Sequence, residues 1–301
     1  MRHLLFVFAL IISTPFIFSQ TLNHTVTDKD GDLKLLGKVD ETGLKKAPFA
    51  EWFNKYHDDY LINTAITKQL KDSLNQYQIK VFFGSWCGDS KRELPKFYKI
   101  LESIKFPENQ LEVIAVDDTE EAYKQSPNHE EKGYNIHRVP TFIFIKDNKE
   151  INRIVEYPKE TLERDMLKIV NNERYIPNYN AANYMFYMVN ETPLEDLKSN
   201  EQFWSSRLAE FVNGSKELNT LGYIFLRSNQ IEKALYIFDL NTKIFPNGYN
   251  VYDSLGEAYF KAKKYTDALK NYYKVLSLKP DDKNAVEMIE KIKTAAEKNK
   301  S

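Results

Sequence analysis

Cysteine is nearly missing from this 301-residue chain, which contains only Cys87. One cysteine excludes an internal disulfide framework and any metal site built from a cysteine cluster. An excess of one charge is also missing, because 42 Lys and Arg balance 43 Asp and Glu. This balance favours neither nucleic acid nor an anionic membrane as a partner. The sequence also lacks Ser-His-Asp, HExxH, P-loop and dinucleotide-binding patterns, so no cofactor or metal is expected.

One apolar run stands at the N-terminus. Arg2 and His3 precede the unbroken apolar residues 4–12, and small residues such as Ser19 follow. This order predicts a signal peptide at residues 1–20 and a mature protein that is exported, either periplasmic or extracellular. The alternative is a retained membrane anchor, although the apolar span is shorter than the ~20 residues that a bilayer requires.

The chain length predicts about two folded domains. We expect residues 21–47 to form a strand with turns, in which Asp28 and Asp30 belong to a turn rather than a calcium loop. The expected later units are an α/β domain at residues 48–172, a linker at 173–182 and a helical domain at 183–300.

The α/β domain shows alternating helical and strand patterns. We expect helix over residues 48–77, strand over 78–83, helix over 90–104, strands over 111–116, 142–145 and 151–155, and a closing helix at 162–170. Pro95 lies inside the second helix and should bend it.

Two short motifs stand in this domain. Trp86-Cys87-Gly88 follows an apolar strand, and Val139-Pro140-Thr141 directly precedes another. Pro95 comes eight residues after Cys87, and Glu93 completes a Glu-x-Pro sequence. Over residues 75–172 this set resembles the thioredoxin superfamily, and Glu-x-Pro is similar to that of periplasmic reductases of the cytochrome-maturation type. The resemblance implies a thioredoxin-like fold, with a central mixed sheet flanked by helices.

The resemblance also implies a role for each motif residue. Cys87 would be the nucleophile at a helix N-terminus, with Trp86 beside it and Pro140 in a cis-proline loop opposite. Val139 would pair its backbone with an extended substrate, as an added strand does. The remaining implied substrate contacts are Thr141, Gly88 and Asp89.

Two positions depart from the family pattern. Ser90 stands where the second cysteine is usual, and Val81 stands where many thioredoxins carry a buried Asp. Both changes remove parts that resolve a mixed disulfide. Ser90 is expected either to hydrogen-bond the Cys87 thiolate or to cap the helix. The helix N-terminus, Lys91 and Arg92 favour the thiolate, and Asp89 opposes it.

Other polar residues allow two interpretations each. His137 is either a surface loop residue or an ion-pair partner of Cys87. Asp117 and Asp118 end a strand, where they form either a cap or turn or a metal site.

The C-terminal part contains an internal repeat. Leu221-Gly222, Phe225, Ala234, Phe238 and Pro246 recur 34 residues later as Leu255-Gly256, Tyr259, Ala268, Tyr272 and Pro280. This period resembles tetratricopeptide repeats, at about residues 215–248 and 249–282. Helical segments at 194–212 and 285–292 should cap the two repeats, whose groove would bind an unidentified protein or peptide.

Three functions remain open at this point. The first is a monothiol thiol–disulfide oxidoreductase, in which Cys87 forms mixed disulfides with protein thiols or small thiols and serves cell redox homeostasis. The second is a binding protein without redox turnover, in which Cys87 is an inert remnant. The third is a scaffold whose repeats assemble a complex. We rank them in that order.

Overall fold

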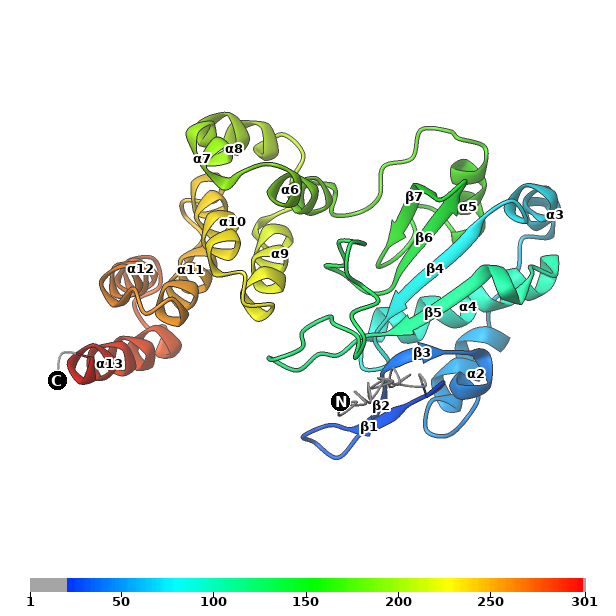
Figure 1. The fold of residues 1–301 in the computed structure, drawn as a ribbon, viewed down its shortest axis with the longest axis horizontal. Helices are drawn as coiled ribbons and strands as arrows, with labels where there is room; N and C mark the ends of the chain where they lie inside the picture. The colour runs from blue at the N-terminus through cyan, green and yellow to red at the C-terminus, as the bar shows by residue number, and fades with distance from the viewer. Residues whose placement is uncertain (1–20, 300–301) are drawn as a thin grey trace, which may run out of the picture.

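The computed structural model describes residues 21–299, which form an α/β part followed by a helical part (Figure 1). The expected signal peptide at residues 1–20 lies outside the described residues. Within residues 21–299, no helix has both the length and the apolar character needed to cross a bilayer.

A five-stranded mixed sheet is the centre of the α/β part, with strand order β3-β5-β4-β6-β7. Its strands are β3 (Gly37–Val39), β4 (Gln78–Phe83), β5 (Leu111–Ala115), β6 (Thr141–Lys146) and β7 (Lys149–Val155). Strands β4 and β5 run parallel because helix α4 (Gly88–Ile104) crosses between them, whereas the other neighbours are antiparallel. A short 3₁₀ turn, η1 (Glu108–Gln110), leads into β5.

A separate antiparallel hairpin precedes the sheet, formed by β1 (Thr25–Thr27) and β2 (Leu33–Leu35). The Asp28 carboxylate accepts hydrogen bonds from the backbone N–H groups of Asp30 and Asp32, both at 2.9 Å. These bonds make the acidic run a turn.

The two faces of the sheet are covered differently. Alternate residues of β4, such as Val81, face a core formed with α2 (Ala50–Asp58), α3 (Thr64–Leu74), α4 and α5 (Leu162–Val170). Phe82 points to the opposite face, where it belongs to a smaller cluster with Val139 and Cys87. Residues 116–140, which connect β5 to β6, supply part of that cluster and contain no regular helix. This second face therefore carries the cysteine.

Several expected helices differ in their bounds. Residues 48–77 form two helices, because Asn63 caps the start of α3 by accepting a hydrogen bond from the Ile66 N–H. A further short helix, α1 (Glu41–Leu44), precedes them, capped by Asp40. Helix α6 (Asn180–Glu191) begins inside the expected linker, and the segment at 194–212 is divided at Asn200.

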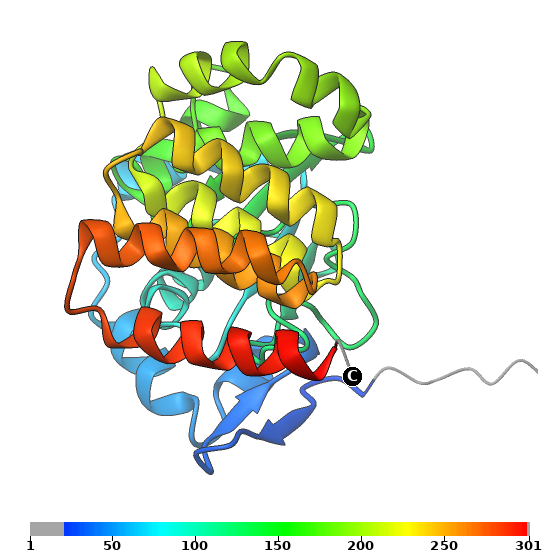
Figure 2. The same ribbon diagram turned by 90° about the vertical axis from the view of Figure 1, so that its left-hand side faces the viewer.

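The helical part continues in antiparallel pairs. After α6 come α7 (Leu194–Ser199), α8 (Glu201–Ala209), α9 (Ser215–Arg227), α10 (Ile231–Ile244), α11 (Tyr249–Lys261), α12 (Tyr265–Leu278) and α13 (Lys283–Lys298), stacked one beside the next (Figure 2). An α/β mixed sheet followed by a helical region confirms the predicted fold class.

The 34-residue repeat has a physical basis in the helix pairs. A Cβ atom on Gly222 of α9 would lie 2.4 Å from the Phe238 ring of α10. A Cβ atom on Gly256 of α11 would lie 2.9 Å from the Tyr272 ring of α12. In both pairs, glycine allows the aromatic ring to lie against the neighbouring helix backbone.

The two parts of the chain meet through the β5–β6 connection (Figure 1). Arg138 donates a 3.1 Å hydrogen bond to the Thr220 hydroxyl of α9. Glu120 forms an ion pair with Arg227 at the end of the same helix. Tyr123 packs against the apolar core of the helical part. The same connection therefore borders both the cysteine and the helices.

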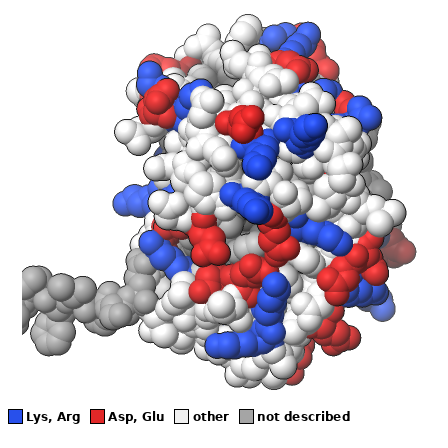
Figure 3. All heavy atoms as spheres, turned by 90° about the vertical axis from the view of Figure 1, so that its right-hand side faces the viewer, with Lys and Arg blue, Asp and Glu red and all other residues white. Residues whose placement is uncertain are grey.

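The opposite side of the α/β part carries mixed charge. Figure 3 shows acidic and basic side chains interspersed on the face at the right of Figure 1. Pairs such as Lys45 with Glu41 are ion-paired in the structure. The mixture matches the overall charge balance of the sequence.

Candidate active site

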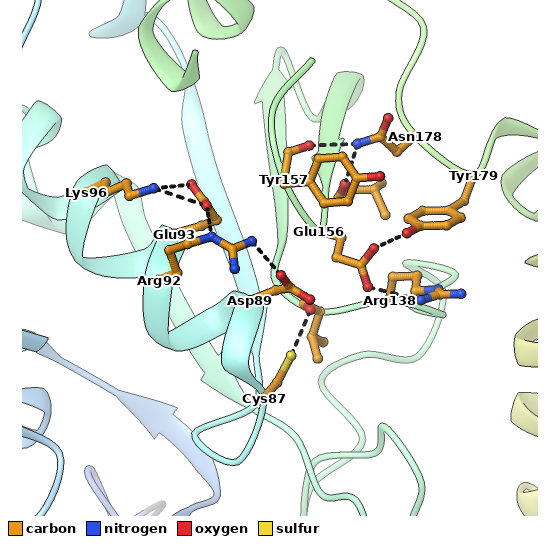
Figure 4. A network of polar contacts seen from close by, with 12 residues as sticks. Cys87, Asp89, Arg92, Glu93, Lys96, Arg138, Glu156, Tyr157, Asn178 and Tyr179 are labelled. Carbon is orange, nitrogen blue, oxygen red and sulfur yellow. Dashed lines mark hydrogen bonds and ion pairs between the residues drawn. The ribbon is translucent and has the colours of Figure 1, made fainter. Parts of the chain in front are cut away.

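Cys87 is positioned by the turn between β4 and α4. It is the N-cap residue of α4, and its backbone N–H donates to the Gly84 carbonyl at 2.9 Å. Its side chain is partly exposed, and Sγ donates a hydrogen bond to the Val139 carbonyl oxygen at 3.3 Å (Figure 4). The sequence motif thus brings the only cysteine to a helix N-terminus that faces the proline loop.

Trp86 folds back against the same turn. Its indole Nε1 donates a 2.9 Å hydrogen bond to the Val116 carbonyl at the end of β5. A Cβ atom on Gly84 would lie 2.5 Å from the Trp86 ring, so the turn requires glycine there. Trp86 therefore forms one wall beside Cys87 and fixes the turn to the sheet.

Ser90 does not make the hydrogen bond expected of it. Its hydroxyl is fully buried and accepts a 3.1 Å hydrogen bond from the Gly84 N–H. Because the Oγ atom is held by the turn, neither a bond to the Cys87 sulfur nor a cap on α4 is present. Ser90 instead ties the first turn of α4 to the end of β4.

The proline loop lies opposite the cysteine. The Val139–Pro140 peptide bond is cis, and the Val139 side chain is buried against the same cluster as Cys87. The Val139 carbonyl accepts a hydrogen bond from the Cys87 thiol. The Val139 N–H, in contrast, has no hydrogen-bond acceptor among residues 21–299. One backbone donor of the expected docking edge is thus unpaired.

Thr141 is the last residue of the proline-loop motif. Its side chain is 2% exposed, and its hydroxyl donates a 2.7 Å hydrogen bond to the Arg138 carbonyl. The hydroxyl is thus used within its own loop, and a contact from Thr141 to a substrate stays a prediction.

The charges on α4 pair with each other. Arg92 bonds both Asp89 and Glu93, and Lys96 bonds Glu93 (Figure 4). The expected support of a thiolate by Arg92 is weakened, because two carboxylates already neutralise this guanidinium. Gly88, next to the cysteine, is exposed and leaves the approach to the sulfur open.

His137 fits neither of its two interpretations. Its ring is 1% exposed and packs edge-on against Tyr179 and against Phe186 of α6. Burial lowers the pKa of His137 to about 3, with nearby Arg153, Arg138 and Lys124 acting in the same direction. The residue is therefore a neutral packing element between the two parts, and no contact joins it to Cys87.

Asp117 and Asp118 are occupied by a lysine. The buried Lys34 ammonium lies 2.5 Å from Asp117 Oδ1 and 2.8 Å from Asp118 Oδ1. Asp117 also accepts from the N–H groups of Asp118 and Thr119, which makes a turn. Within the described part of the chain, no group of three or more His, Cys, Asp or Glu residues is arranged for a metal ion.

Sequence patterns did not point to a second set of polar residues beside the proline loop. Arg138 lies 3.0 Å from Glu156 and 4.2 Å from the centre of the Tyr179 ring. The Glu156 N–H donates to the Pro140 carbonyl at 2.7 Å, and its carboxylate accepts from the Tyr179 hydroxyl (Figure 4). These residues are far apart in the sequence and carry no motif.

Lys124 is the other unpredicted residue. It stands in the connection after β5, only 6% exposed, with its ammonium over the rings of Tyr123 and Trp86. Burial lowers its pKa to about 7, helped by the charge of Arg138. A lone Tyr-Lys pair in a polar loop gives no sequence signal for this placement.

Comparisons with known proteins agree with this architecture. A family model described as thioredoxin matches residues 45–170. Thioredoxin H-type of Oryza sativa subsp. indica is 32% identical over 89 residues, covering 30% of this chain and 65% of that protein. Thioredoxin H-type of Picea mariana is 32% identical over 83 residues, which cover 28% of this chain and 58% of that protein.

A further relative extends the match slightly. Thioredoxin H2 of Arabidopsis thaliana is 28% identical over 101 residues, covering 34% of this chain and 68% of that protein. The chain thus spans less than two thirds of the length of the two H-type relatives. Together with the sheet order and the cysteine turn, these matches identify residues 45–170 as a thioredoxin-like domain, which a helical region follows.

Proposed function

We propose that the protein is a monothiol thiol–disulfide oxidoreductase that acts through Cys87. The observation that supports this most directly is the placement of a partly exposed thiol at the N-terminus of α4, facing the cis Val139–Pro140 bond. The unpaired N–H groups of a helix N-terminus favour the thiolate, which is the reactive form of cysteine.

The proposed reaction has two halves. The Cys87 thiolate attacks one sulfur of a substrate disulfide, which breaks the S–S bond, forms a mixed disulfide and releases the other sulfur as a thiolate. Because Cys87 is the only cysteine of the chain, a thiol from another molecule then attacks the mixed disulfide and restores Cys87. Protein disulfides and small-molecule disulfides are both substrates of this kind.

A docking edge for an extended substrate supports the same proposal. The Val139 N–H has no acceptor among the described residues, and the Val139 carbonyl holds only the thiol hydrogen. When the thiolate forms, that hydrogen bond is lost, and both backbone groups can then pair with a peptide strand.

The rest of the proposal concerns location and partners. The charged start and apolar run at residues 1–20 support export to an oxidising compartment, where a disulfide substrate persists. The 34-residue repeat and its glycine–aromatic contacts support a tetratricopeptide-like helical part that recruits a protein or peptide partner.

The test is trapping with the full mature chain. Wild-type protein, Cys87→Ser and a control, Ser205→Ala, are incubated with a peptide disulfide in which one thiol is a chromophoric leaving group. Ser205 carries a partly exposed hydroxyl on α8. Wild type and Ser205→Ala should release the chromophore and carry the peptide adduct by mass, whereas Cys87→Ser should do neither. Absence of an adduct on wild type would reject the enzymatic proposal.

A binding protein without turnover is the second candidate. One observation favours it: the thiol is already hydrogen-bonded to Val139, and no second cysteine can resolve an adduct. In this case a peptide that lacks cysteine would bind wild type and Cys87→Ser with the same affinity. Wild type would release no chromophore in the trapping assay.

A further inference from the structure

Lys124 is enclosed beside the cysteine turn, and it belongs to none of the sequence motifs described above. Lys124 has no carboxylate within 4.0 Å of its Nζ atom among residues 21–299, unlike the equally buried Lys34. Its ammonium lies 3.7 Å from the centre of the Tyr123 ring and 5.9 Å from that of Trp86. Burying a charge without a counter-ion is costly, and such residues are candidates for functional positions.

The charged groups around Lys124 come from three segments: the β5–β6 connection, the start of α4 and the end of β7. Arg138 of the proline loop opposes its positive charge, whereas Cys87, Glu156 and Asp118 favour it. The buried His137 ring also lies within range of its charge. The pKa of Lys124 is lowered to about 7 chiefly by burial, so the charge of this residue responds to small changes near it.

We propose that Lys124 is a positioning residue for Cys87: its ammonium, held between the Tyr123 and Trp86 rings, stabilises the attacking thiolate and then the leaving thiolate. This inference rests on the proposed function. The ammonium lies over the ring of Trp86, which precedes Cys87 in the chain and packs in the same cluster, so a negative charge on the Cys87 sulfur and the charge of Lys124 attract each other. Lys124 thereby supplies the positive charge that Arg92 cannot, because Asp89 and Glu93 engage that guanidinium.

The proposed step is a thiol–disulfide exchange at Cys87. Cys87 loses its proton to solvent, and its thiolate attacks one sulfur of the substrate disulfide, which is reduced as Cys87 is oxidised. The second sulfur leaves as a thiolate, which the charge of the Lys124 ammonium stabilises and which solvent then protonates. The partner cysteine of the usual motif is not needed for this half-reaction.

The helical part completes the enclosure of the lysine. Lys124 and Tyr123 line a groove of about 700 Å³ together with Phe186 of α6 and Ile224 of α9. Since burial is the main cause of the lowered pKa of Lys124, the helices that line this groove contribute to it.

The test uses the single cysteine as its own reporter. The rate of Cys87 alkylation by iodoacetamide is measured from pH 5 to 10 on the full chain of wild type, Lys124→Met, Lys124→Arg and Lys68→Met. Lys68 is exposed on α3 and serves as the matched loss of one positive charge. Circular dichroism and thermal unfolding establish that each variant is folded.

Lys124→Met should alkylate roughly three- to tenfold more slowly at pH 7, with the midpoint of the rate profile moved to higher pH. Lys124→Arg should restore the wild-type midpoint because it keeps the charge, and Lys68→Met should match wild type. A Lys124→Met profile that superimposes on wild type would overturn the inference, as would a shifted profile that Lys124→Arg does not restore. Failure of the proposed function appears separately, as wild type that forms no peptide adduct in the trapping assay.

Discussion

The Cys87 sulfur donates a hydrogen bond to the carbonyl oxygen of Val139 across 3.3 Å. This bond joins the start of α4 to the cis-proline loop and stabilises the neutral thiol. In the proposed function, a substrate strand and the thiol would compete for this carbonyl oxygen, and formation of the thiolate would free it.

We predict that alkylation of Cys87 destabilises the protein. The modified sulfur has no hydrogen to donate, so the contact with Val139 is lost at a cost of up to about 1 kcal/mol in unfolding free energy. Urea unfolding of wild type before and after iodoacetamide treatment measures this cost. Treated Cys87→Ser should be unchanged, and an unaltered wild-type midpoint would argue against the bond.

Ser90→Ala should be less stable than wild type. The change leaves the buried Gly84 N–H without its acceptor, which costs about 1–3 kcal/mol. Urea unfolding gives the difference in unfolding free energy, with Ser205→Ala at a partly exposed position as the control. Equal stability of Ser90→Ala and wild type would mean that another group satisfies the Gly84 N–H.

Ser90→Cys should restore internal resolution of the mixed disulfide. A second thiol at this position lies in the first turn of α4, where the family pattern has its partner cysteine. A peptide adduct on Cys87 should then disappear without added thiol, and mass spectrometry should find a loss of two hydrogens from the chain. A persistent adduct would show that the buried position cannot reach the Cys87 sulfur.

Acid should weaken the fold through His137. Because burial lowers its pKa from 6.5 to about 3, the unfolded chain binds a proton over this range that the folded chain does not. Unfolding free energy should therefore fall as pH decreases from about 6.5 to 3, by up to about 1.4 kcal/mol per unit. His137→Leu should flatten this part of the stability profile, and an equally steep profile in the variant would assign the slope to other groups.

The helix pairs of the repeat should not tolerate a methyl group at their contact glycines. Gly222→Ala and Gly256→Ala place Cβ atoms against Phe238 and Tyr272, and we expect each to cost about 1–3 kcal/mol. Gly88→Ala is the control for stability, since nothing lies within 4 Å of its added Cβ atom. Thermal unfolding compares the three variants. A Gly222→Ala variant with the unfolding temperature of wild type would contradict the close contact between Gly222 and Phe238.

The sequence was most informative where structure depends on local pattern. The apolar run of β4 and the motifs around Cys87 and Pro140 are read from neighbours along the chain, and they predicted the α/β fold class and the proximity of Cys87 to the proline loop. The break at residues 59–63 was missed because apolar spacing alone does not reveal the Asn63 cap.

The residues that sequence reasoning misplaced depend on contacts between distant segments. His137 is buried because Phe186 and Tyr179 cover it, and both lie more than forty positions away. Lys124 is enclosed by Trp86 and by a groove that α6 and α9 complete. No sequence pattern near His137 or Lys124 predicts that these side chains are buried, so only the tertiary structure reveals it.

The hydrogen bond from Arg138 to Thr220 gives the proline loop a direct mechanical link to α9. A displacement of α9 would therefore also move Arg138, the residue next to Val139, so the position of this helix and the geometry of the proline loop depend on each other.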